Sequence, residues 1–294
     1  MGFFKNLFRR KTRVEKVDIA KRFELMNRIG QGSMSKVWKA RDSHSGRVVA
    51  LKILDRVKTK KLEARFIGLN KPSEGEIAVK LDHPHIVKTF DHGITTKDEQ
   101  FLVMEYVDGV SLGYMIASQN DTMKANRLRF AIELGEAVGY FHRQNLIHRD
   151  LCPRNVLLNR NYSVKLIDFG LVVPNTPDFR KPGNRTGTAS YMAPELMKRQ
   201  RTDQRIDIFS YAVTCYEMFT KRMPWDSIET LEMMKQRMNT PPEPITSFVP
   251  DIDPRLAEAI MRGVASDPDK RWSTIGPMIQ ALREVQDELE YEAI

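Results

Sequence analysis

Residues 148–155 read HRDLCPRN, residues 167–170 read IDFG, and residues 187–195 read GTASYMAPE. These three stretches are the most specific part of a sequence of 294 residues. They are short segments between longer helical or apolar stretches, and each carries charged or polar side chains. Asp150 and Asn155 lie five residues apart in the first of them. The fold and the function of the chain depend mainly on these stretches.

Two weaker signals lie upstream. Residues 29–37, IGQGSMSKV, place Gly30 and Gly32 two positions apart, and residues 49–52 read VALK. Glycines at this spacing can bring backbone N–H groups close to phosphate oxygens, although a plain hairpin has the same signature. Lys52 ends an apolar run, and an unpaired ammonium group is costly to bury. Lys52 therefore either has an anionic partner or lies on an edge strand with its side chain in water.

All five motifs follow one another in a recognised order: the glycine loop, VALK, HRD with its Asn, DFG and APE. In them the sequence closely resembles the eukaryotic-type protein kinase family, over about residues 24–285. It is most similar to serine/threonine kinases with a bacterial-type single kinase domain. The resemblance implies an α+β, two-lobed protein kinase fold. The N-lobe would be a small antiparallel β-sheet with one regulatory helix, and the larger C-lobe would be mostly helical.

Hydrophobic patterning agrees with this division. Apolar runs at 48–54 and 101–104 are typical of buried strands, and one helical interruption is expected within the N-lobe. Helical spacing follows, and it is clearest at residues 128–141, 208–219 and 254–264. The predicted parts are a basic amphipathic tail at 1–22, an N-lobe at 23–107, a C-lobe at 108–286 and an acidic end at 287–294.

The resemblance assigns the residues of phosphoryl transfer, a reaction that needs positioning and charge neutralisation more than covalent chemistry. Asp150 would orient the hydroxyl of the substrate and accept its proton. Asn155 and Asp168 would hold Mg²⁺, which prefers hard oxygen ligands. For Asp168 the alternative is a turn cap. Lys52 would reach the α- and β-phosphates of ATP.

Other residues match the family's nucleotide-binding positions. The glycine loop would cover the phosphates, and apolar side chains would hold the adenine ring. Met104 resembles the gatekeeper, and Glu105 and Val107 resemble the hinge residues whose backbone meets the adenine edge. The predicted nucleotide-binding set is Ile29, Gly30, Gln31, Gly32, Ser33, Val37, Ala50, Lys52, Met104, Glu105, Val107 and Leu157.

In this family a helix glutamate holds the lysine of the VALK strand, and two candidates occur here. Glu74 shares a predicted helix face with the apolar residues that follow it at helical spacing. Glu76 is the third helical residue after Ser73, which is the spacing of a capping box. The capping role of Glu76 leaves Glu74 as the favoured partner of Lys52, and Glu76 remains the alternative.

Three further charged residues are interpreted as structural. Asp207 matches the aspartate that braces the catalytic loop of the family. Glu195 and Arg271 match its buried ion pair. Removing one partner of such a pair typically costs about 3–5 kcal/mol.

The catalytic loop departs from the family at Cys152, where serine/threonine kinases usually place a Lys that contacts the transferred phosphate. A thiol cannot supply that charge, so Cys152 is either an inert small residue or a nucleophilic or redox-active group. Arg154 is included among the catalytic residues because its guanidinium could substitute electrostatically, and the alternative is a surface charge. Many tyrosine kinases carry an Arg at this position. Residues 187–194, with Thr188 expected beside Asp150, instead resemble serine/threonine kinases.

The predicted function is ATP-dependent transfer of the γ-phosphate to Ser or Thr hydroxyls of protein substrates, with Mg²⁺. A catalytically weak or dead kinase-fold scaffold and a tyrosine or dual specificity are the alternatives, both because of the loop at 150–155. A small-molecule phosphotransferase of related fold is disfavoured, because the segment 187–195 resembles a platform for a peptide.

Charge is concentrated at the two ends of the chain. The net charge is +9, and the first 22 residues contain eight basic and two acidic residues. The body is therefore nearly balanced, and no nucleic-acid partner is expected. As a helix, the tail would place Phe3, Phe4, Leu7 and Phe8 opposite most basic residues. The tail is expected to dock on a partner or on the acidic C-terminal end, or alternatively on an anionic membrane surface.

Two cysteines are too few for a disulfide framework, which indicates a reducing compartment. The sequence contains no apolar run of 18 residues, so no membrane span is expected. The N-terminus carries charged residues where a signal peptide would be apolar. The expected location is cytoplasmic, with peripheral membrane contact as an open alternative.

Overall fold

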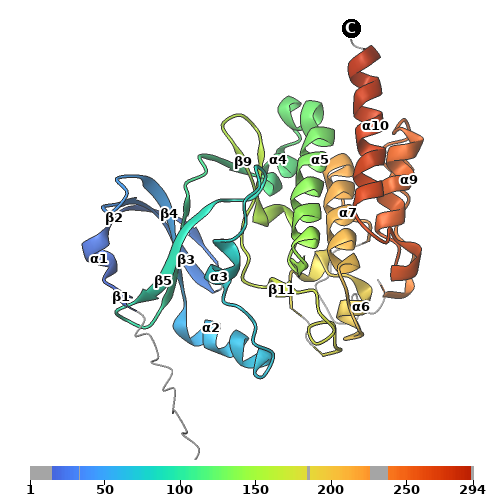
Figure 1. The fold of residues 1–294 in the computed structure, drawn as a ribbon. Coiled ribbons are helices and arrows are strands. Elements are labelled where there is room, and N and C mark those ends of the chain that lie inside the picture. The colour runs from blue at the N-terminus through green and yellow to red at the C-terminus, as the bar shows by residue number, and fades with distance from the viewer. Residues whose placement is uncertain (1–14, 33, 184–185, 226–237, 293–294) are drawn as a thin grey trace, which may run out of the picture. The chain divides into compact units, whose positions relative to one another are not determined.

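The computed structural model describes residues 15–32, 34–183, 186–225 and 238–292. The chain divides into two compact units (Figure 1). The first comprises residues 1–61 and 89–106, and the second comprises residues 62–88 and 107–294. The mixed α+β architecture, with a sheet in the first unit and mainly helices in the second, confirms the predicted fold class.

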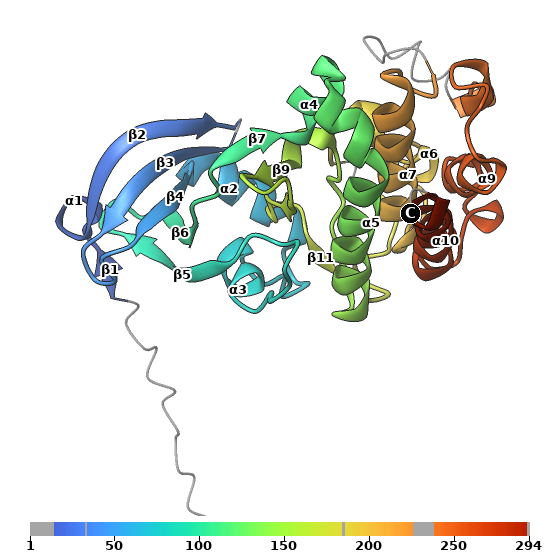
Figure 2. The same ribbon diagram turned by 90° about the horizontal axis from the view of Figure 1, so that it is seen from above.

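The first unit is built on a six-stranded sheet in the order β1-β5-β6-β4-β3-β2 (Figure 2). Strand β1 pairs parallel with β5, and the other neighbouring strands are antiparallel. The apolar runs predicted as strands at 48–54 and 101–104 are confirmed as β4 and most of β6. The strands are β1 (Lys16–Val17), β2 (Phe23–Gln31), β3 (Ser35–Asp42), β4 (Val48–Leu54), β5 (Thr89–Thr95) and β6 (Gln100–Glu105).

One face of this sheet carries the hydrophobic core of the first unit. Val49 and Leu51 on β4 face the same side as Phe101 and Val103 on β6, because side chains alternate along a strand. Phe23 from β2 packs against Phe101 edge to face, with ring centroids 6.3 Å apart. The even-numbered side chains of β4 therefore lie on the opposite face.

Residues 15–22, within the predicted tail, join this sheet. Helix α1 (Ile19–Arg22) begins at Asp18, whose carboxylate accepts a hydrogen bond from Ala20 N–H. Arg22 then donates to Asp42 at 3.0 Å and to Asp91 at 2.7 Å. Strand β1 and these bonds tie the chain to β3 and β5, whereas residues 1–14 lie outside the described residues.

Residues 56–78 contain more helix than the single interruption expected. They form α2 (Arg56–Glu63), the short 3-10 helix η1 (Ala64–Phe66) and α3 (Glu74–Ala78). The sequence of α2, RVKTKKLE, is mostly charged and lacks the apolar periodicity that predicts a helix. In α3, Ser73 and Glu76 form the expected capping box, with each side chain bonded to the other residue's backbone N–H.

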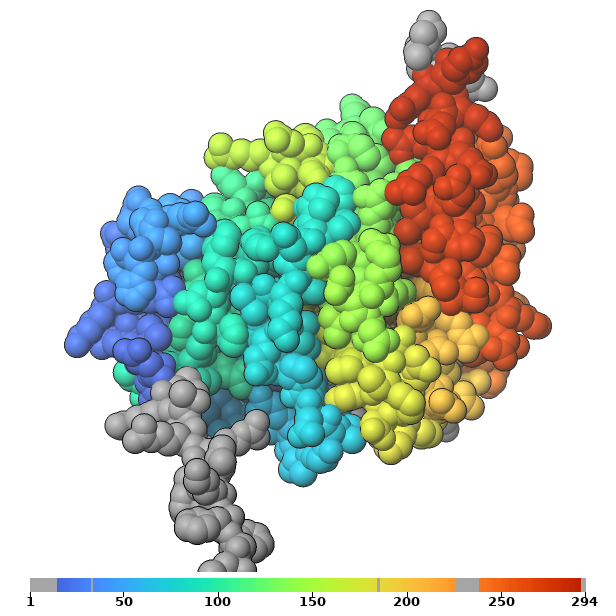
Figure 3. All heavy atoms as spheres, viewed as in Figure 1, coloured from blue at the N-terminus to red at the C-terminus, as the bar shows by residue number. Residues whose placement is uncertain are grey.

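Long helices form the frame of the second unit, and α5, α7 and α10 run side by side in Figures 1 and 2. Tyr211 in α7 donates to the carbonyl oxygen of Ala131 in α5 at 2.8 Å. Figure 3 shows α10 on the surface beside α5, where Arg283 pairs with Glu136. The helices are α4 (Leu112–Ser118), α5 (Asp121–Arg143), α6 (Pro194–Met197), α7 (Arg205–Thr220), α9 (Pro254–Gly263) and α10 (Gly276–Glu292).

Short strands of the second unit hold its functional loops. One small sheet has the order β10-β9-β7, and β11 pairs with β8. Residues 148–155 lie between β8 and β9, and residues 167–170 follow β10. The strands are β7 (Gly109–Ser111), β8 (Leu146–Ile147), β9 (Val156–Asn159), β10 (Val164–Leu166) and β11 (Val173–Pro174), and the 3-10 helices are η2 (Pro153–Asn155), η3 (Ala189–Tyr191), η4 (Ile245–Ser247) and η5 (Pro268–Lys270). Within the described ranges, every helix is too short or too polar to cross a membrane.

Candidate active site

Helix α7 anchors the loop at residues 148–155 through hydrogen bonds. Asp207, fully buried in the first turn of that helix, accepts hydrogen bonds from the backbone N–H groups of His148 at 2.7 Å and Arg149 at 2.8 Å. Burial alone would raise the pKa of Asp207, but the hydrogen bonds from His142 and the backbone hold that pKa below its usual range. Asp207 is therefore an ionised brace, as the sequence indicates.

Two residues orient the Asp150 carboxylate. Thr188 is distant in sequence, and Asn155 lies in the same loop. Asp150 Oδ1 accepts hydrogen bonds from Thr188 N–H and from Thr188 Oγ1–H, both at 2.8 Å. Asn155 donates from Nδ2 to Asp150 Oδ2 at 3.2 Å and to the Asp150 backbone oxygen at 2.8 Å. The 3-10 helix η2 turns the chain back, so that the five-residue spacing becomes a direct contact.

Asp168 follows β10 in an unusual backbone conformation. Its φ is 69°, in the left-handed region that residues other than glycine rarely adopt. The carboxylate accepts a hydrogen bond from Gly170 N–H at 3.3 Å, so the turn-cap interpretation describes a real contact. Ile167 N–H also donates to the Asn155 backbone oxygen at 2.8 Å, which joins the two predicted metal-binding residues through their loops.

The geometry of α3 distinguishes the two glutamates. Glu76 is exposed and bonded to its own cap, whereas Glu74 is buried, with 7% exposure. A Cβ atom on Gly170 would lie 3.3 Å from Glu74 Oε2 and 3.5 Å from Asp168 Oδ1. Both carboxylates thus point to one place beside Gly170. This supports Glu74 as the functional glutamate, and its pairing with Lys52 stays a prediction.

Cys152 is a buried thiol beside the same threonine. Its Sγ lies 3.8 Å from Thr188 Oγ1 and the side chain is 2% exposed. Burial and the neighbouring Asp150 carboxylate raise the pKa of the Cys152 thiol. The thiol is therefore protonated near neutral pH, which favours the inert interpretation over the nucleophilic one.

Arg154 has the opposite environment. Its side chain is exposed, and Nη2 lies 3.5 Å from Thr188 Oγ1. One oxygen atom, Thr188 Oγ1, therefore contacts Asp150, Cys152 and Arg154.

Gly187 lets the activation segment, which is the stretch from Asp168 to Glu195, approach the catalytic loop at residues 148–155 closely. Its φ is 127°, and a Cβ atom there would lie 2.7 Å from the Arg149 backbone oxygen. An L side chain would both strain the backbone and collide with that oxygen. The glycine before Thr188 is thus what allows Thr188 to reach Asp150.

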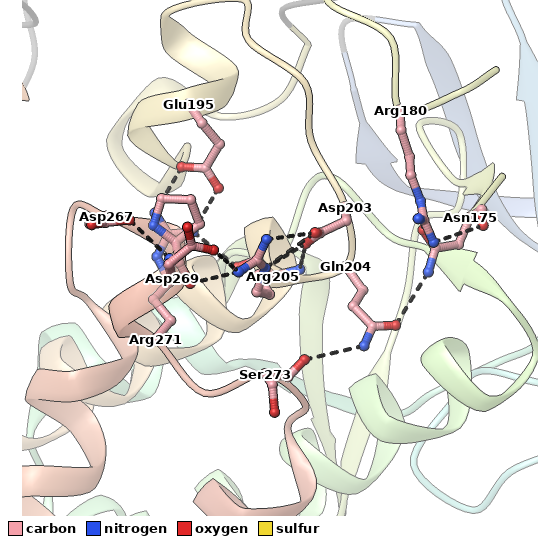
Figure 4. Close-up of polar contacts among 11 residues, drawn as sticks. Asn175, Arg180, Glu195, Asp203, Gln204, Arg205, Asp267, Asp269, Arg271 and Ser273 are labelled. Carbon is pink, nitrogen blue, oxygen red and sulfur yellow. Dashed lines mark hydrogen bonds and ion pairs between the residues drawn. The ribbon is translucent and has the colours of Figure 1, made fainter. Parts of the chain in front are cut away.

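The end of the activation segment is anchored by the predicted buried ion pair. Arg271 donates to the two carboxylate oxygens of Glu195 at 2.6 and 2.7 Å, and its side chain is fully buried (Figure 4). Arg271 Nε also donates to the Ala265 backbone oxygen at 2.7 Å. Arg205, at the start of α7, pairs with Asp203 and Asp269 beside it (Figure 4).

A second polar anchor was not predicted. Arg180 donates to Asn175 Oδ1 at 2.8 Å, and Asn175 donates to Gln204 Oε1 at 3.2 Å (Figure 4). Gln204 in turn reaches the Ser273 backbone oxygen at 3.4 Å. Amide side chains in loops have no periodicity and occur in many turns, so the sequence held no signal for this network.

The ring of Phe179 in the activation segment forms another contact that was not predicted. Its centroid lies 6.0 Å from that of Phe66 in η1. Lys71, between η1 and α3, lies over Phe66, with Nζ 5.6 Å from the ring centroid. The segment before α3 thus packs on the activation segment through aromatic side chains.

In the first unit, strand register gathers the predicted nucleotide-binding residues on the face opposite the core. Val37 pairs with Gly30 and with Lys52, and Ala50 pairs with Met104. Directly opposed residues in antiparallel strands project to the same face, so Val37, Ala50, Lys52 and Met104 share it.

The remaining members of the set lie in three places. Ile29 and Gln31 are on β2, Gly32 donates its N–H to the Ser35 backbone oxygen at 3.0 Å, and Glu105 ends β6. Ser33 lies outside the described residues. Val107 and Leu157 belong to the second unit, and Leu157 lies on β9 opposite Ser111 and Lys165.

Comparison with known sequences decides the family. The family model described as "Protein kinase domain" matches residues 23–284. The chain belongs to the protein kinase family. The five motifs, the braced catalytic loop and the buried Glu195–Arg271 pair are thus features of a kinase.

Curated bacterial relatives cover most of this kinase domain. A probable serine/threonine-protein kinase of Streptomyces coelicolor is 32% identical over 265 residues, which is 87% of this chain and 39% of the relative. The serine/threonine-protein kinase PknB of Mycolicibacterium smegmatis is 28% identical, over 92% of this chain and 44% of the relative. The chain thus spans about two fifths of the length of these relatives.

Proposed function

We propose that this kinase transfers the γ-phosphate of ATP to Ser or Thr hydroxyls of protein substrates. The observation that supports this most strongly is the Asp150 carboxylate, which is held by Thr188 from residues 187–195 and by Asn155 from its own loop. An aspartate with its rotamer fixed in this way is suited to positioning a hydroxyl group, which is the protein's main task in phosphoryl transfer. The names of the relatives, all serine/threonine kinases, support the same acceptor class.

The hydrogen bonds of Asp150 indicate which oxygen would take the proton. A carboxylate oxygen offers about two lone-pair sites. Two donors from Thr188 fill those of Oδ1, whereas Oδ2 receives one hydrogen bond from Asn155. The substrate hydroxyl would therefore donate to Oδ2, and its proton would pass to that oxygen as the phosphoryl group is transferred.

Asn155 and Asp168 are the proposed Mg²⁺ ligands. Asn155 uses its Nδ2 for Asp150, which leaves its side-chain oxygen for another partner. An amide oxygen and one carboxylate, completed by phosphate oxygens, form the donor set that Mg²⁺ takes in nucleotide sites, so these residues fit the ion. Bound Mg²⁺ would neutralise charge on the phosphates.

The first unit is proposed to bind the nucleotide through the sheet face opposite its core. Val37 and Ala50 would contact the adenine ring, with Met104 as the gatekeeper. Lys52 would contact the α- and β-phosphates, with Glu74 as the partner that holds it. The glycine loop and the hinge residues Glu105 and Val107 complete this proposal.

Serine/threonine specificity is preferred over tyrosine specificity because Thr188 contacts Asp150 directly. The scaffold alternative rests on Cys152, which provides no positive charge. Arg154, an exposed cation that touches Thr188, is proposed to stabilise negative charge near the reacting groups in its place.

A direct test is incubation with Mg²⁺ and labelled ATP, followed by phospho-amino-acid analysis of protein substrates. Phosphoserine and phosphothreonine are the expected products, and Asp150→Asn is expected to lower the rate by about 10²–10⁴-fold. Asp178→Asn is the matched control, because Asp178 is an exposed carboxylate paired with Lys181. Phosphotyrosine alone would contradict the acceptor class, and no label above the Asp150→Asn background would contradict the activity.

We further propose that the part of the basic segment 1–22 that precedes β1, residues 1–14, docks on an acidic partner or on the acidic C-terminal end, in a reducing compartment. Lys16 already pairs with Asp98 at 2.6 Å within the first unit, and both cysteines are free buried thiols. Co-sedimentation with anionic liposomes, compared with a chain that lacks residues 1–14, tests the membrane alternative. Binding that depends on those residues would favour the membrane over the partner.

A further inference from the structure

We propose that Arg154 selects substrates that carry an anionic side chain about two residues from the acceptor Ser or Thr. This inference rests on the proposed function and specifies its substrate class. The anion is either a carboxylate or a phosphoryl group added earlier. The selecting feature is an exposed guanidinium beside the proposed catalytic base.

The Asp150 carboxylate and the Arg154 guanidinium lie close together, because both contact Thr188. Its Oγ1 donates to Asp150 Oδ1 at 2.8 Å and accepts from Arg154 Nη2 at 3.5 Å. A substrate hydroxyl that reaches Asp150 therefore brings its neighbouring residues near the Arg154 guanidinium. In an extended peptide, residues two apart project to the same side about 7 Å from each other, which is within reach of an Arg side chain.

The charge of this part of the loop comes from Arg154. Arg149, the other arginine of residues 148–155, is 6% exposed and its backbone N–H is held by Asp207. Cys152 is a thiol, which carries no positive charge, and it is buried, with 2% exposure. Among residues 148–155, all of which the structure describes, Arg154 is thus the cation that a bound peptide can meet.

The backbone at Arg154 is held in a hydrogen-bonded turn, whereas its side chain can change partners. Arg154 lies within η2, between Pro153 and Asn155, and Asn155 N–H donates to the Cys152 backbone oxygen at 2.9 Å. The bond from Arg154 to Thr188 is long for an N–H···O bond, so little is lost when it is exchanged. A planar guanidinium binds a carboxylate or phosphate with two parallel hydrogen bonds, which are stronger.

The test uses threonine peptides that differ at one position, two residues before or after the acceptor. That position carries Asp, phosphoserine, Ala or Lys. An anion is expected to raise kcat/KM by about 10-fold over Ala, mainly through KM, because it adds a charge-assisted hydrogen bond to the guanidinium. Comparison of Asp with phosphoserine shows which source of the anion is preferred.

Two variants of the same loop position identify the selecting residue. Arg154→Gln is expected to remove the difference between Asp and Ala peptides, and Arg154→Glu is expected to reverse it in favour of Lys. Arg160→Gln is the matched control, because Arg160 is an exposed arginine paired with Asp108 in the same unit. This control is expected to retain the wild-type preference.

Binding measurements keep the inference independent of turnover. Fluorescence anisotropy with the Asp150→Asn protein should give a lower Kd for the anionic peptides, and adding Arg154→Gln should abolish that difference. Equal Kd and kcat/KM for Asp, phosphoserine, Ala and Lys peptides would overturn the inference. Arg154→Gln is also expected to lower kcat on every peptide, because Arg154 is proposed to stabilise charge near the reacting groups. The inference is therefore overturned if the ratio of kcat/KM for the Asp and Ala peptides stays at its wild-type value in that variant. Failure of transfer to any acceptor would instead contradict the proposed function.

Discussion

The two units position their functional side chains in different ways. In the first unit the proposed nucleotide-binding residues stand on regular strands, where register alone places Val37, Lys52 and Met104 on one face. In the second unit the proposed catalytic residues stand on loops, and polar contacts from distant residues hold them. Asp207 bonds the loop backbone and Thr188 bonds the Asp150 carboxylate.

This difference predicts different responses to mutation. A strand face tolerates the loss of one side chain, because the ladder of backbone hydrogen bonds remains. A loop held by a few buried polar groups does not, because each removal leaves an unsatisfied partner. Function in the second unit should therefore be more sensitive to single substitutions away from the site than function in the first.

The largest effect is expected at the buried ion pair of the second unit. Glu195→Gln leaves the Arg271 guanidinium buried without its counter-charge, which should cost about 3–5 kcal/mol of unfolding free energy. Urea denaturation measures this change. Glu288→Gln, which breaks the exposed pair with Arg255, is the control and should leave the unfolding midpoint unchanged. Similar destabilisation by both variants would contradict the importance of burial.

Gly187→Ala tests the close approach between the activation segment and the catalytic loop. The new Cβ would collide with the Arg149 backbone oxygen, so Thr188 should shift away from Asp150 and kcat should fall by about 10-fold or more. Gly183 has the same φ of 127° with open space around it, so Gly183→Ala isolates the backbone strain from the collision. Equal kinetic effects of the two variants would argue against the collision.

A pair of valines tests the two faces of the sheet in the first unit. Val49→Ala opens a cavity in the core and should lower the unfolding free energy by about 2 kcal/mol. Val37→Ala, on the opposite face, should instead raise KM for ATP a few-fold with a smaller effect on stability. Denaturation and ATP titration of both variants show whether one face of the sheet determines stability and the other determines nucleotide binding. If Val37→Ala left KM unchanged, the assignment of the nucleotide face would be wrong.

The smallest effect concerns acid stability of the first unit. Burial opposes ionisation of Asp42, but hydrogen bonds from Arg22 and Ser45 hold the pKa of Asp42 below its usual range. A carboxyl group whose pKa is lowered in the folded state contributes stability above its unfolded pKa and loses it as the pH falls through its folded pKa. The Asp42→Asn variant should therefore lose less unfolding free energy than the wild type as the pH falls below about 4. An unchanged pH profile would contradict the contribution of Asp42.

The sequence predicted most of the features that regular structure and the spacing within motifs determine. The apolar runs located β4 and β6, and the spacing of Ser73 and Glu76 predicted the capping box of α3. The placement of Thr188 beside Asp150 and the bracing by Asp207 were also predicted, from the resemblance.

Contacts between distant loops could not be predicted in this way. The Phe66–Phe179 contact and the network of Asn175, Arg180 and Gln204 join segments that no periodicity links. Helix α2 was missed because its sequence is mostly charged, and β1 was missed because two residues are too few for a pattern. Tertiary contacts, rather than local sequence preference, determine the loop contacts and β1. Helix α2 differs, because its Arg, Lys, Leu and Glu residues have good helix propensity that a search for apolar periodicity does not detect.

The double hydrogen bond from Thr188 to Asp150 has a consequence for the entropy of activation. The Asp150 carboxylate is held in one rotamer before any substrate arrives, so no torsional freedom is lost when the hydroxyl docks. A fixed dipole also avoids the solvent reorganisation that a freely rotating carboxylate would require. Truncating the Thr188 hydroxyl should therefore make the activation entropy more unfavourable, which the temperature dependence of kcat would report.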